Sequence, residues 1–235
     1  MPNIVPLDNV THADLQVRIG YGAKFGNAVN QIAVLPGEFA GVQRDCPILF
    51  RKGGHGYEAV AILGLDRDSN LFLTQRAEWQ ARYIPALART GPFKLGEGAQ
   101  GDPVVLVDLD HPRIAADDDE DAAPVFLPHG GHAPALDMAL AALRIMHGAE
   151  DEQARMSRLF EDLSLPEPVN LTVTRANGQE VRFDGYFTIG EDRLAALTPE
   201  QLGALNAAGM LGPVVHAAAS LTNFNTLLAL DGQGR

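Results

Sequence analysis

The chain has 235 residues, and its composition of 46% hydrophobic and 20% charged residues is typical of a globular protein and excludes wholesale disorder. Acidic residues outnumber basic ones by 30 to 18, which gives a net charge of −12 and argues against nucleic acid as a partner. The single cysteine, Cys46, excludes an intramolecular disulfide and a cysteine-rich zinc module. Its position ahead of a short apolar run predicts a small buried hydrophobic residue rather than a nucleophile.

The N-terminal residues show no basic segment followed by an apolar run of signal-peptide length. No window of about 18 uncharged apolar residues occurs, so we expect no transmembrane helix. The longest apolar stretch, residues 210–230, is interrupted by Gly, Pro, His and Asn and predicts a buried helix. We therefore expect a cytoplasmic protein, in agreement with the single thiol.

The first part of the chain predicts an antiparallel, strand-rich region. The glycines of residues 20–26 lack the spacing of a dinucleotide-binding loop and predict a turn-rich connection. Short apolar runs at residues 47–50, 59–65 and 70–73 lie between turn signals and predict strands. The polar segment 66–70 has the length of a hairpin turn, so we expect the last two of these strands to pair.

Beyond a further predicted strand at residues 104–107 lies the sharpest change of composition, five adjacent carboxylates at residues 117–121. Their mutual repulsion favours a solvated loop, and the run lacks the spacing and the glycine of a calcium loop. We therefore divide the chain into a strand-rich region 1–116, an acidic and Gly-rich loop 117–133, and a helical region 134–235. We expect the two main regions to pack as one unit.

The helical region begins with a predicted helix from Pro134 to about His147, because proline suits the first helical turn and Gly148 can end it. Apolar residues at positions 156, 159, 160 and 163 then follow the spacing of an amphipathic helix. This pattern predicts a second helix that buries one face.

The dipeptide Asn177-Gly178, between two alternating runs, predicts one β-hairpin. A capping box at residues 198–201 predicts the start of another helix, with Leu202 and Leu205 facing inward. Apolar residues from 214 to 228 form a last helical stripe. Together these elements predict an α+β fold, with an antiparallel sheet in a strand-rich N-terminal half and a helix-rich C-terminal half that contains one hairpin.

No nucleophile elbow and no phosphate-binding P-loop occurs in the sequence. His129 and His132 are the only closely spaced histidines, and two imidazoles three residues apart are able to share a metal. The two glycines between them favour a flexible loop instead, and no third ligand is fixed nearby.

A second candidate metal site starts from His12 and Asp14, which have the His-x-Asp spacing of iron-dependent oxygenases. In those enzymes a distant second histidine completes the ligand set, and His111 and His216 are the candidates here. The alternative is that His12 caps or packs at the edge of the first element. We favour this structural interpretation and predict no cofactor, with iron as the alternative.

The densest unusual cluster of the sequence is Trp79, Tyr83, Arg89 and Phe93. Trp79 and Tyr83 are four residues apart, so on a helical turn they share a face, and Pro85 would end that turn. Two rings beside a guanidinium suit the recognition of a sugar, a peptide or a carboxylate. Ordinary core packing around one satisfied arginine explains the same residues, and both interpretations stay open.

At these residues the chain resembles the SapC family of bacterial proteins. The resemblance adds Glu38 and Asn70 to Trp79, Tyr83 and Arg89 as candidate binding residues. The family shows paired arginines just before a Pro-Phe step, where this chain has a single arginine. The markers that carry the resemblance over nearly the whole chain are Pro6-Leu7, His12, Glu38-Phe39, residues 47–50, Leu63-Gly64-Leu65, Asn70-Leu71-Phe72, Trp79, residues 83–86, Arg89, Pro92-Phe93, residues 185–189, His216 and Ser220-Leu221.

The resemblance implies a cellular setting for the protein but no particular reaction. The family takes its name from surface-layer loci, and many relatives are encoded beside outer-membrane nutrient receptors, flavin-dependent halogenase-like proteins and cupin-like hydroxylases. We therefore predict a SapC-like accessory or binding protein that recognises a peptide, sugar or protein partner in a nutrient-uptake or peptide-modification system. The alternatives are a non-haem iron, 2-oxoglutarate-type oxygenase-like enzyme and a structural subunit of a homo-oligomer that associates through the apolar last helix.

Overall fold

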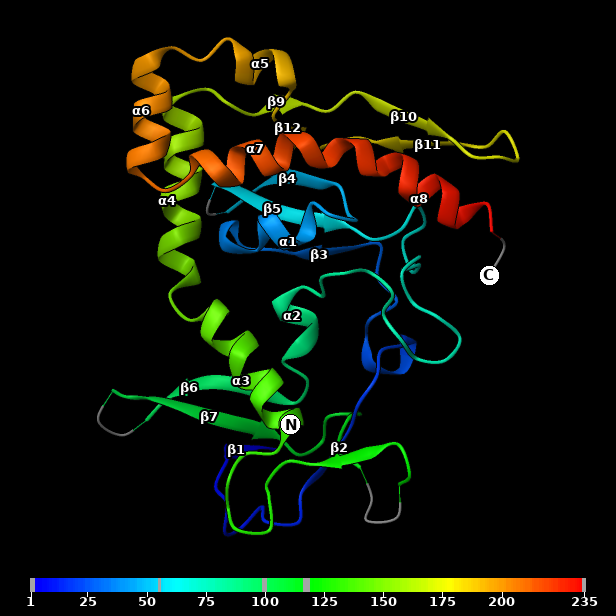
Figure 1. Cartoon of the computed structure of the whole chain (residues 1–235), viewed down its shortest axis with the longest axis vertical. Helices are drawn as coiled ribbons and strands as arrows, with labels where there is room; N and C mark the ends of the chain where they lie inside the picture. Colours follow the sequence, from blue (N-terminus) through cyan, green and yellow to red (C-terminus); the bar gives the residue numbers. More distant parts are fainter. Residues whose placement is uncertain (1–2, 55, 99–100, 116–118, 234–235) are drawn as a thin grey trace. The chain divides into compact units, whose positions relative to one another are not determined.

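The computed structural model describes residues 3–54, 56–98, 101–115 and 119–233, and it has the predicted α+β fold with antiparallel sheets (Figure 1). The chain forms two compact units that interleave along the sequence. The first unit consists of Met1–Asn27, Arg76–Glu78 and Ala86–His147, and the second consists of Ala28–Gln75, Trp79–Pro85 and Gly148–Arg235. The division at residues 116 and 134 follows composition and stays a prediction.

The first unit contains two small antiparallel sheets, one with the strand order β1-β7-β6 and one made of β2 and β8. Its elements are β1 (Ile4–Pro6), β2 (Gln16–Arg18), the 3₁₀ helix η1 (Ala23–Phe25), α2 (Ala86–Arg89), β6 (Phe93–Glu97), β7 (Pro103–Asp108), β8 (Ala122–Pro124) and α3 (Pro134–Met146). Helix α3 begins at Pro134 and Gly148 follows it with a φ of 79°, as predicted. The core of this unit joins Phe93 and Val107 of the larger sheet to Leu136 and Leu143 of α3.

The turn-rich connection at residues 20–26 is held by a buried arginine that the sequence did not single out. The Arg113 guanidinium lies 4.3 Å from the centre of the Phe25 ring and 5.3 Å from that of Tyr21. It donates hydrogen bonds to the carbonyl oxygen of Arg18 (3.1 Å) and to Oδ1 of Asn27 (3.3 Å). Burial lowers the pKa of Arg113 and raises that of Tyr21.

The predicted acidic loop falls partly outside the described residues, which omit 116–118. Asp119 is not simply solvated, because Nε of Arg18 donates to its Oδ2 at 2.5 Å. One carboxylate of the run therefore ties this loop to the end of β2.

The second unit is built on one antiparallel five-stranded sheet with the order β3-β5-β4-β12-β9, and it also contains the hairpin β10-β11. Its strands are β3 (Gln31–Ala33), β4 (Ile48–Gly53), β5 (Gly56–Ile62), β9 (Glu167–Pro168), β10 (Leu171–Thr174), β11 (Glu180–Phe183) and β12 (Phe187–Thr188). Its helices are η2 (Pro36–Glu38), α1 (Phe39–Val42), α4 (Ala149–Asp162), α5 (Glu191–Ala195), α6 (Pro199–Ala207), α7 (Leu211–Ser220), η3 (Leu221–Asn223) and α8 (Phe224–Asp231).

Helix α4 packs on the five-stranded sheet through its predicted apolar stripe. The Phe160 ring meets Phe50 of β4 edge to face, with the ring centres 5.1 Å apart. Oγ of Ser157 accepts a hydrogen bond of 2.8 Å from the amide of Tyr57. Gly56 has a φ of 90°, and a Cβ added there would lie 1.9 Å from that Oγ, so only glycine fits between β5 and the helix.

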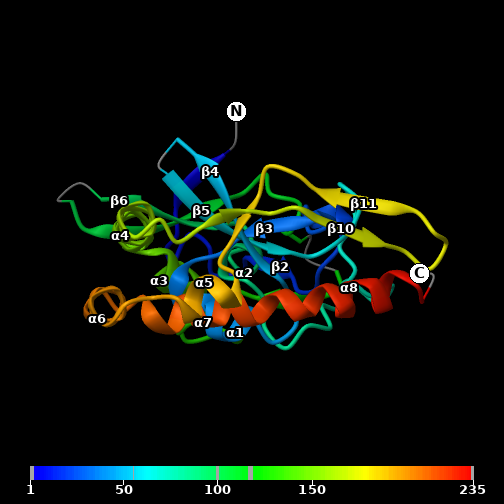
Figure 2. The same ribbon diagram turned by 90° about the horizontal axis from the view of Figure 1, so that it is seen from above.

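Helices α7 and α8 follow one another alongside this sheet (Figure 2). Oγ of Ser220 accepts from the amide of Ile48 at 2.8 Å and donates to the carbonyl of Ala217 at 2.6 Å. The side-chain amide of Asn223 donates to the carbonyl of Gln43 at 2.7 Å. These bonds fix the end of α7 to the beginning of β4.

The hairpin turn and the capping box that were predicted in the C-terminal half are confirmed. Gly178 has a φ of 84° in the turn of the β10-β11 hairpin. Oγ1 of Thr198 accepts from the amide of Gln201 at 3.3 Å and completes the capping box of α6. Leu205 is fully buried, but Leu202 is 37% exposed, so its predicted inward orientation is wrong.

The predicted strand at residues 70–73 is wrong. Of its predicted pairing with residues 59–65, the structure has the bond from the amide of Leu71 to the carbonyl of Leu63, at 2.8 Å. Oδ1 of Asn70 accepts from the amide of Phe72 at 3.0 Å, and this local bond turns the backbone out of the extended conformation. Strand β5 pairs instead with β3 and with β4, and the β4-β5 hairpin closes where Gly53 pairs with Gly56.

The predicted helical turn at residues 79–83 is also wrong. Trp79 forms an isolated bridge with Leu73, and the chain remains irregular up to Pro85. Helix α2 begins at Ala86, directly after this proline. Proline therefore precedes a helix here instead of ending one.

Among the described residues, no single helix is long and apolar enough to cross a membrane. Only α6 combined with the following stretch Leu211–Asp231 reaches that length and composition, with a bend of 105° between them.

Candidate functional site

The predicted binding residues are divided between the two units. Glu38, Asn70, Trp79 and Tyr83 belong to the second unit, whereas Arg89 is the last residue of α2 in the first.

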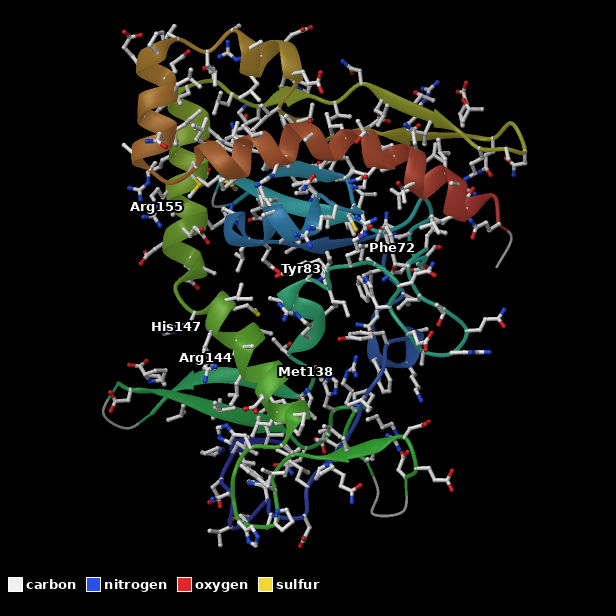
Figure 3. The ribbon with its side chains drawn as sticks, in the orientation of Figure 1. Phe72, Tyr83, Met138, Arg144, His147 and Arg155 are labelled. Atoms are coloured by element: carbon white, nitrogen blue, oxygen red, sulfur yellow. The ribbon has the colours of Figure 1, made fainter. Side chains whose placement is uncertain are left out.

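Glu38 and Tyr83 form a hydrogen-bonded pair in the second unit. The hydroxyl of Tyr83 (Figure 3) donates to Oε1 of Glu38 at 3.0 Å, and the carboxylate is only 3% exposed. Oε2 of Glu38 accepts from the amide of Leu35 at 3.0 Å, which closes the turn of η2. A Cβ added at Gly41 would lie 2.5 Å from the Tyr83 ring, so α1 leaves space for the ring only because this residue is glycine.

Trp79 and Asn70 are each 8% exposed. Asn70 holds the turn before Phe72, and Trp79 is part of the bridge with Leu73. The two predicted rings, Trp79 and Tyr83, therefore do not share an exposed helical face. The role of Trp79, Tyr83 and Asn70 in binding stays a prediction, whereas their side chains take part in contacts that stabilise the fold of the second unit.

The oxygenase-type ligands are also divided between the units. His12, which is 9% exposed, has its Nδ1 3.2 Å from both the amide nitrogen and the carbonyl oxygen of Asp8, and Asp14 is exposed. His216 lies in α7 of the second unit. Within the described part of the chain, no three His, Cys, Asp or Glu side chains come together as a metal ion requires.

The turn that carries His12 is stabilised by Asp8. Its Oδ1 accepts from the amides of Val10 (2.9 Å) and Thr11 (2.7 Å), and these bonds hold the pKa of Asp8 below its ordinary value. His12 therefore lies buried in the turn between β1 and β2, against Asp8, and its role as a ligand or as a structural residue stays a prediction.

A cavity of about 570 Å³ lies in the second unit, where the end of β3 and the start of β5 meet the first turns of α4. Its apolar wall consists of Ala33, Val34, Leu35, Ala59 and Ala154. Its polar side consists of Glu58, Glu150, Asp151 and Gln153. A volume of this size accommodates a few side chains of a bound molecule.

Hydrogen bonds fix both sides of this acidic cavity. Leu35 is held by the Glu38 carboxylate, which makes a predicted binding residue a support of the cavity wall. On the other side, the amide of the Gln153 side chain donates to the carbonyl oxygen of Tyr57. The start of α4 is thereby anchored to β5, and the cavity has a preformed shape.

The cavity has a negative rim. Glu150 and Asp151 stand in the first turn of α4, where the partial positive charge of the helix N-terminus favours carboxylates. Glu58 of β5 also lines the cavity, and none of the lining residues that the structure describes is basic. The arrangement suits a group that is both apolar and cationic.

This cavity was not predicted from the sequence. Its signal is the acidic run 150–152, which begins two residues after Gly148 and by itself indicates only a helix start. Nothing in the sequence shows that this turn lies beside the end of β3, because the two segments are far apart in the chain.

A second cavity, of about 400 Å³, lies in the first unit between β1, β7 and α3 and is lined mainly by core side chains such as Leu7 and Leu136. Its polar groups bond to one another or to nearby residues. The amide of Asn9 donates to the carbonyl of Gly130 at 3.1 Å, and Nδ1 of His132 is 3.5 Å from the Asp137 carboxylate. Because these polar groups are already bonded, the second cavity is the weaker candidate for a binding site.

Comparison with protein families gives a match to SapC over residues 7–227. No curated protein and no solved structure matches the chain. The matched stretch spans most of the chain and includes segments of both units. The chain therefore belongs to the SapC family.

Proposed function

We propose that this SapC-family protein is an accessory protein that binds a basic peptide or protein segment in the acidic cavity of the second unit. The observation that carries the proposal is the preformed 570 Å³ cavity, which combines an apolar wall with the acidic first turn of α4. The net charge of −12 adds a long-range attraction for a basic partner.

A peptide suits this cavity better than a sugar does. Sugar rings are commonly bound against aromatic side chains, and the lining residues within the described chain include none. Lysine and arginine side chains combine an apolar stem with a cationic head, which matches the apolar wall and the acidic rim.

The cellular setting of the proposal rests on the family resemblance. We place the protein in the cytoplasm, as the partner of a nutrient-uptake or peptide-modification system. The basic segment would then belong to a component of that system.

Fluorescence anisotropy tests the proposal with two labelled probes, a short peptide of alternating valine and lysine and the same peptide with glutamate in place of lysine. We expect the lysine peptide to bind, more weakly as salt rises, and the glutamate peptide not to bind. The double substitution Glu150→Gln and Asp151→Asn should weaken binding roughly tenfold.

A matched control is present in the same unit. Glu191 and Asp192 are two exposed carboxylates in the first turn of α5 and line no part of the acidic cavity. The substitutions Glu191→Gln and Asp192→Asn should leave the affinity unchanged. The proposal fails if the lysine peptide does not bind, or if the control variant loses as much affinity as the cavity variant.

A further inference from the structure

Strand β3 is one edge of the five-stranded sheet, and its register shows which of its backbone groups face outward. The amide of Val34 donates to the carbonyl of Ala59 on β5 at 3.1 Å. Because residues of an antiparallel ladder alternate in direction, Gln31 and Ala33 turn their N–H and C=O groups away from β5. Ala33 is exposed, and within the described chain no hydrogen bond reaches its outward groups.

The opposite edge of the sheet is closed to such pairing. On β9, the amide of Val169 bonds to the carbonyl of Tyr186, so Pro168 is the residue that faces outward. Proline has no N–H to donate, and prolines on edge strands are a common means of preventing strand addition.

The β1 edge of the first unit is also protected from strand addition by an outward-facing proline. The amide of Leu7 bonds to the carbonyl of Val105, so the alternation leaves Ile4 and Pro6 facing outward. The outward positions of β3, in contrast, are occupied by Gln31 and Ala33, and both have a donor to offer.

The open edge of β3 also adjoins the acidic cavity. Ala33 lines that cavity, and so does Val34, whose partner Ala59 lies on the strand against which α4 packs. A strand laid along β3 would therefore turn every second side chain toward the carboxylates of α4.

We infer that the partner segment binds as an added β-strand on β3, with its backbone bonded to Gln31 and Ala33 and its basic side chains, one at every second position, in the acidic cavity. This inference rests on the proposed function and states how the same cavity takes its ligand. Backbone bonds supply affinity in this mode of recognition, and the alternate side chains supply specificity.

The charge of the protein favours a basic segment over a second copy of the chain as the strand that pairs with β3. Pairing two β3 edges would bring two sets of rim carboxylates together, on molecules that each carry a net charge of −12. A basic segment meets the same rim with opposite charge.

The first test uses the unaltered protein and two forms of the valine–lysine peptide. One form carries N-methyl groups on alternate residues of the edge that would face β3, and the other carries them on the opposite edge. Both keep every side chain and every charge. Methylation of the facing edge should weaken binding about tenfold for each hydrogen bond lost, and methylation of the opposite edge should leave it unchanged.

The second test alters the protein at Ala33. Ala33→Pro removes the outward N–H without removing a bond to β5, and Ala33→Val keeps the N–H with a side chain of similar bulk. We expect the proline variant to lose affinity about tenfold relative to the valine variant. Circular dichroism melting curves of both variants establish that they are folded.

The outcomes separate the two proposals. If neither peptide edge responds to methylation while the lysine peptide still binds and the cavity variant still weakens it, the added strand is wrong and the binding function stands. If the unmodified peptide does not bind, both are wrong. If light scattering shows a dimer that Ala33→Pro dissociates, β3 pairs with a second copy and the inference is overturned.

Discussion

At the scale of single residues, the first unit depends on a polar cluster that no sequence pattern indicates. Arg113 lies against two rings of the turn-rich segment 20–26, and its own amide donates to Nδ1 of His111 at 3.1 Å. Burial and the nearby Arg113 charge lower the pKa of His111 below its ordinary value of 6.5. The cation–π contacts of Arg113 therefore hold the segment 20–26, and the His111 ring holds the backbone at Arg113.

The lowered pKa of His111 predicts a loss of stability in mild acid. At pH values between the lowered pKa and 6.5, His111 is mainly neutral in the folded chain, whereas it is mainly protonated in the unfolded chain. The stability that His111 contributes is therefore complete above about pH 6.5 and decreases as the pH falls through the lowered pKa. Urea unfolding measured at about pH 7.5 and about pH 5.5 should show a decrease that His111→Gln makes smaller.

The exposed His129 serves as the control for this measurement. His129→Gln should leave the difference in the free energy of unfolding between the two pH values unchanged, since this side chain is exposed. An equal change in both variants would contradict the assignment to His111.

At the scale of elements, the sequence predicted those structures whose signals are local. Proline at the start of α3, the Asn-Gly turn of the β10-β11 hairpin and the capping box of α6 act within a few residues, and all three occur as predicted. The strand at 70–73 and the helical turn at 79–83 failed because the side-chain bond of Asn70 and the bridge between Leu73 and Trp79 overrode periodicity. The acidic cavity was beyond prediction because it joins β3 to α4 only through the tertiary fold.

The contact between β5 and α4 gives a prediction at this scale. Gly56→Ala combines an unfavourable φ with a Cβ 1.9 Å from Oγ of Ser157, whereas Gly178 has a similar φ with open space around it. We expect Gly56→Ala to lower the free energy of unfolding by about 3 kcal/mol and Gly178→Ala by about 1 kcal/mol. Urea unfolding followed by circular dichroism measures both, and equal losses would show that α4 does not restrict Gly56.

At the scale of the whole molecule, the alternative that the protein is a homo-oligomer subunit requires an exposed apolar face on the last helices, α7 and α8. Of the predicted apolar stripe, Val214, Ala217 and Phe224 are buried within the second unit. Its other two members, Leu221 and Leu228, are partly buried. Val215, at 43%, is the large apolar side chain of α7 and α8 that the described structure leaves exposed. An obligate interface needs a much larger apolar surface than one side chain.

We therefore expect a monomer of 25.1 kDa in multi-angle light scattering. Val215→Glu should leave the mass and the melting temperature unchanged. A dimer that this substitution dissociates would instead support the structural subunit proposed from the sequence.

The position of Pro168 on β9 has a consequence for self-association. A sheet with donors on both edges can propagate from molecule to molecule, because each added strand offers a new edge and fibres follow. In this sheet the β9 edge is blocked, so the β3 edge of one molecule does not pair with the β9 edge of the next. Concentrated solutions of the protein are then expected to stay clear, without the turbidity that chain-to-chain polymerisation produces.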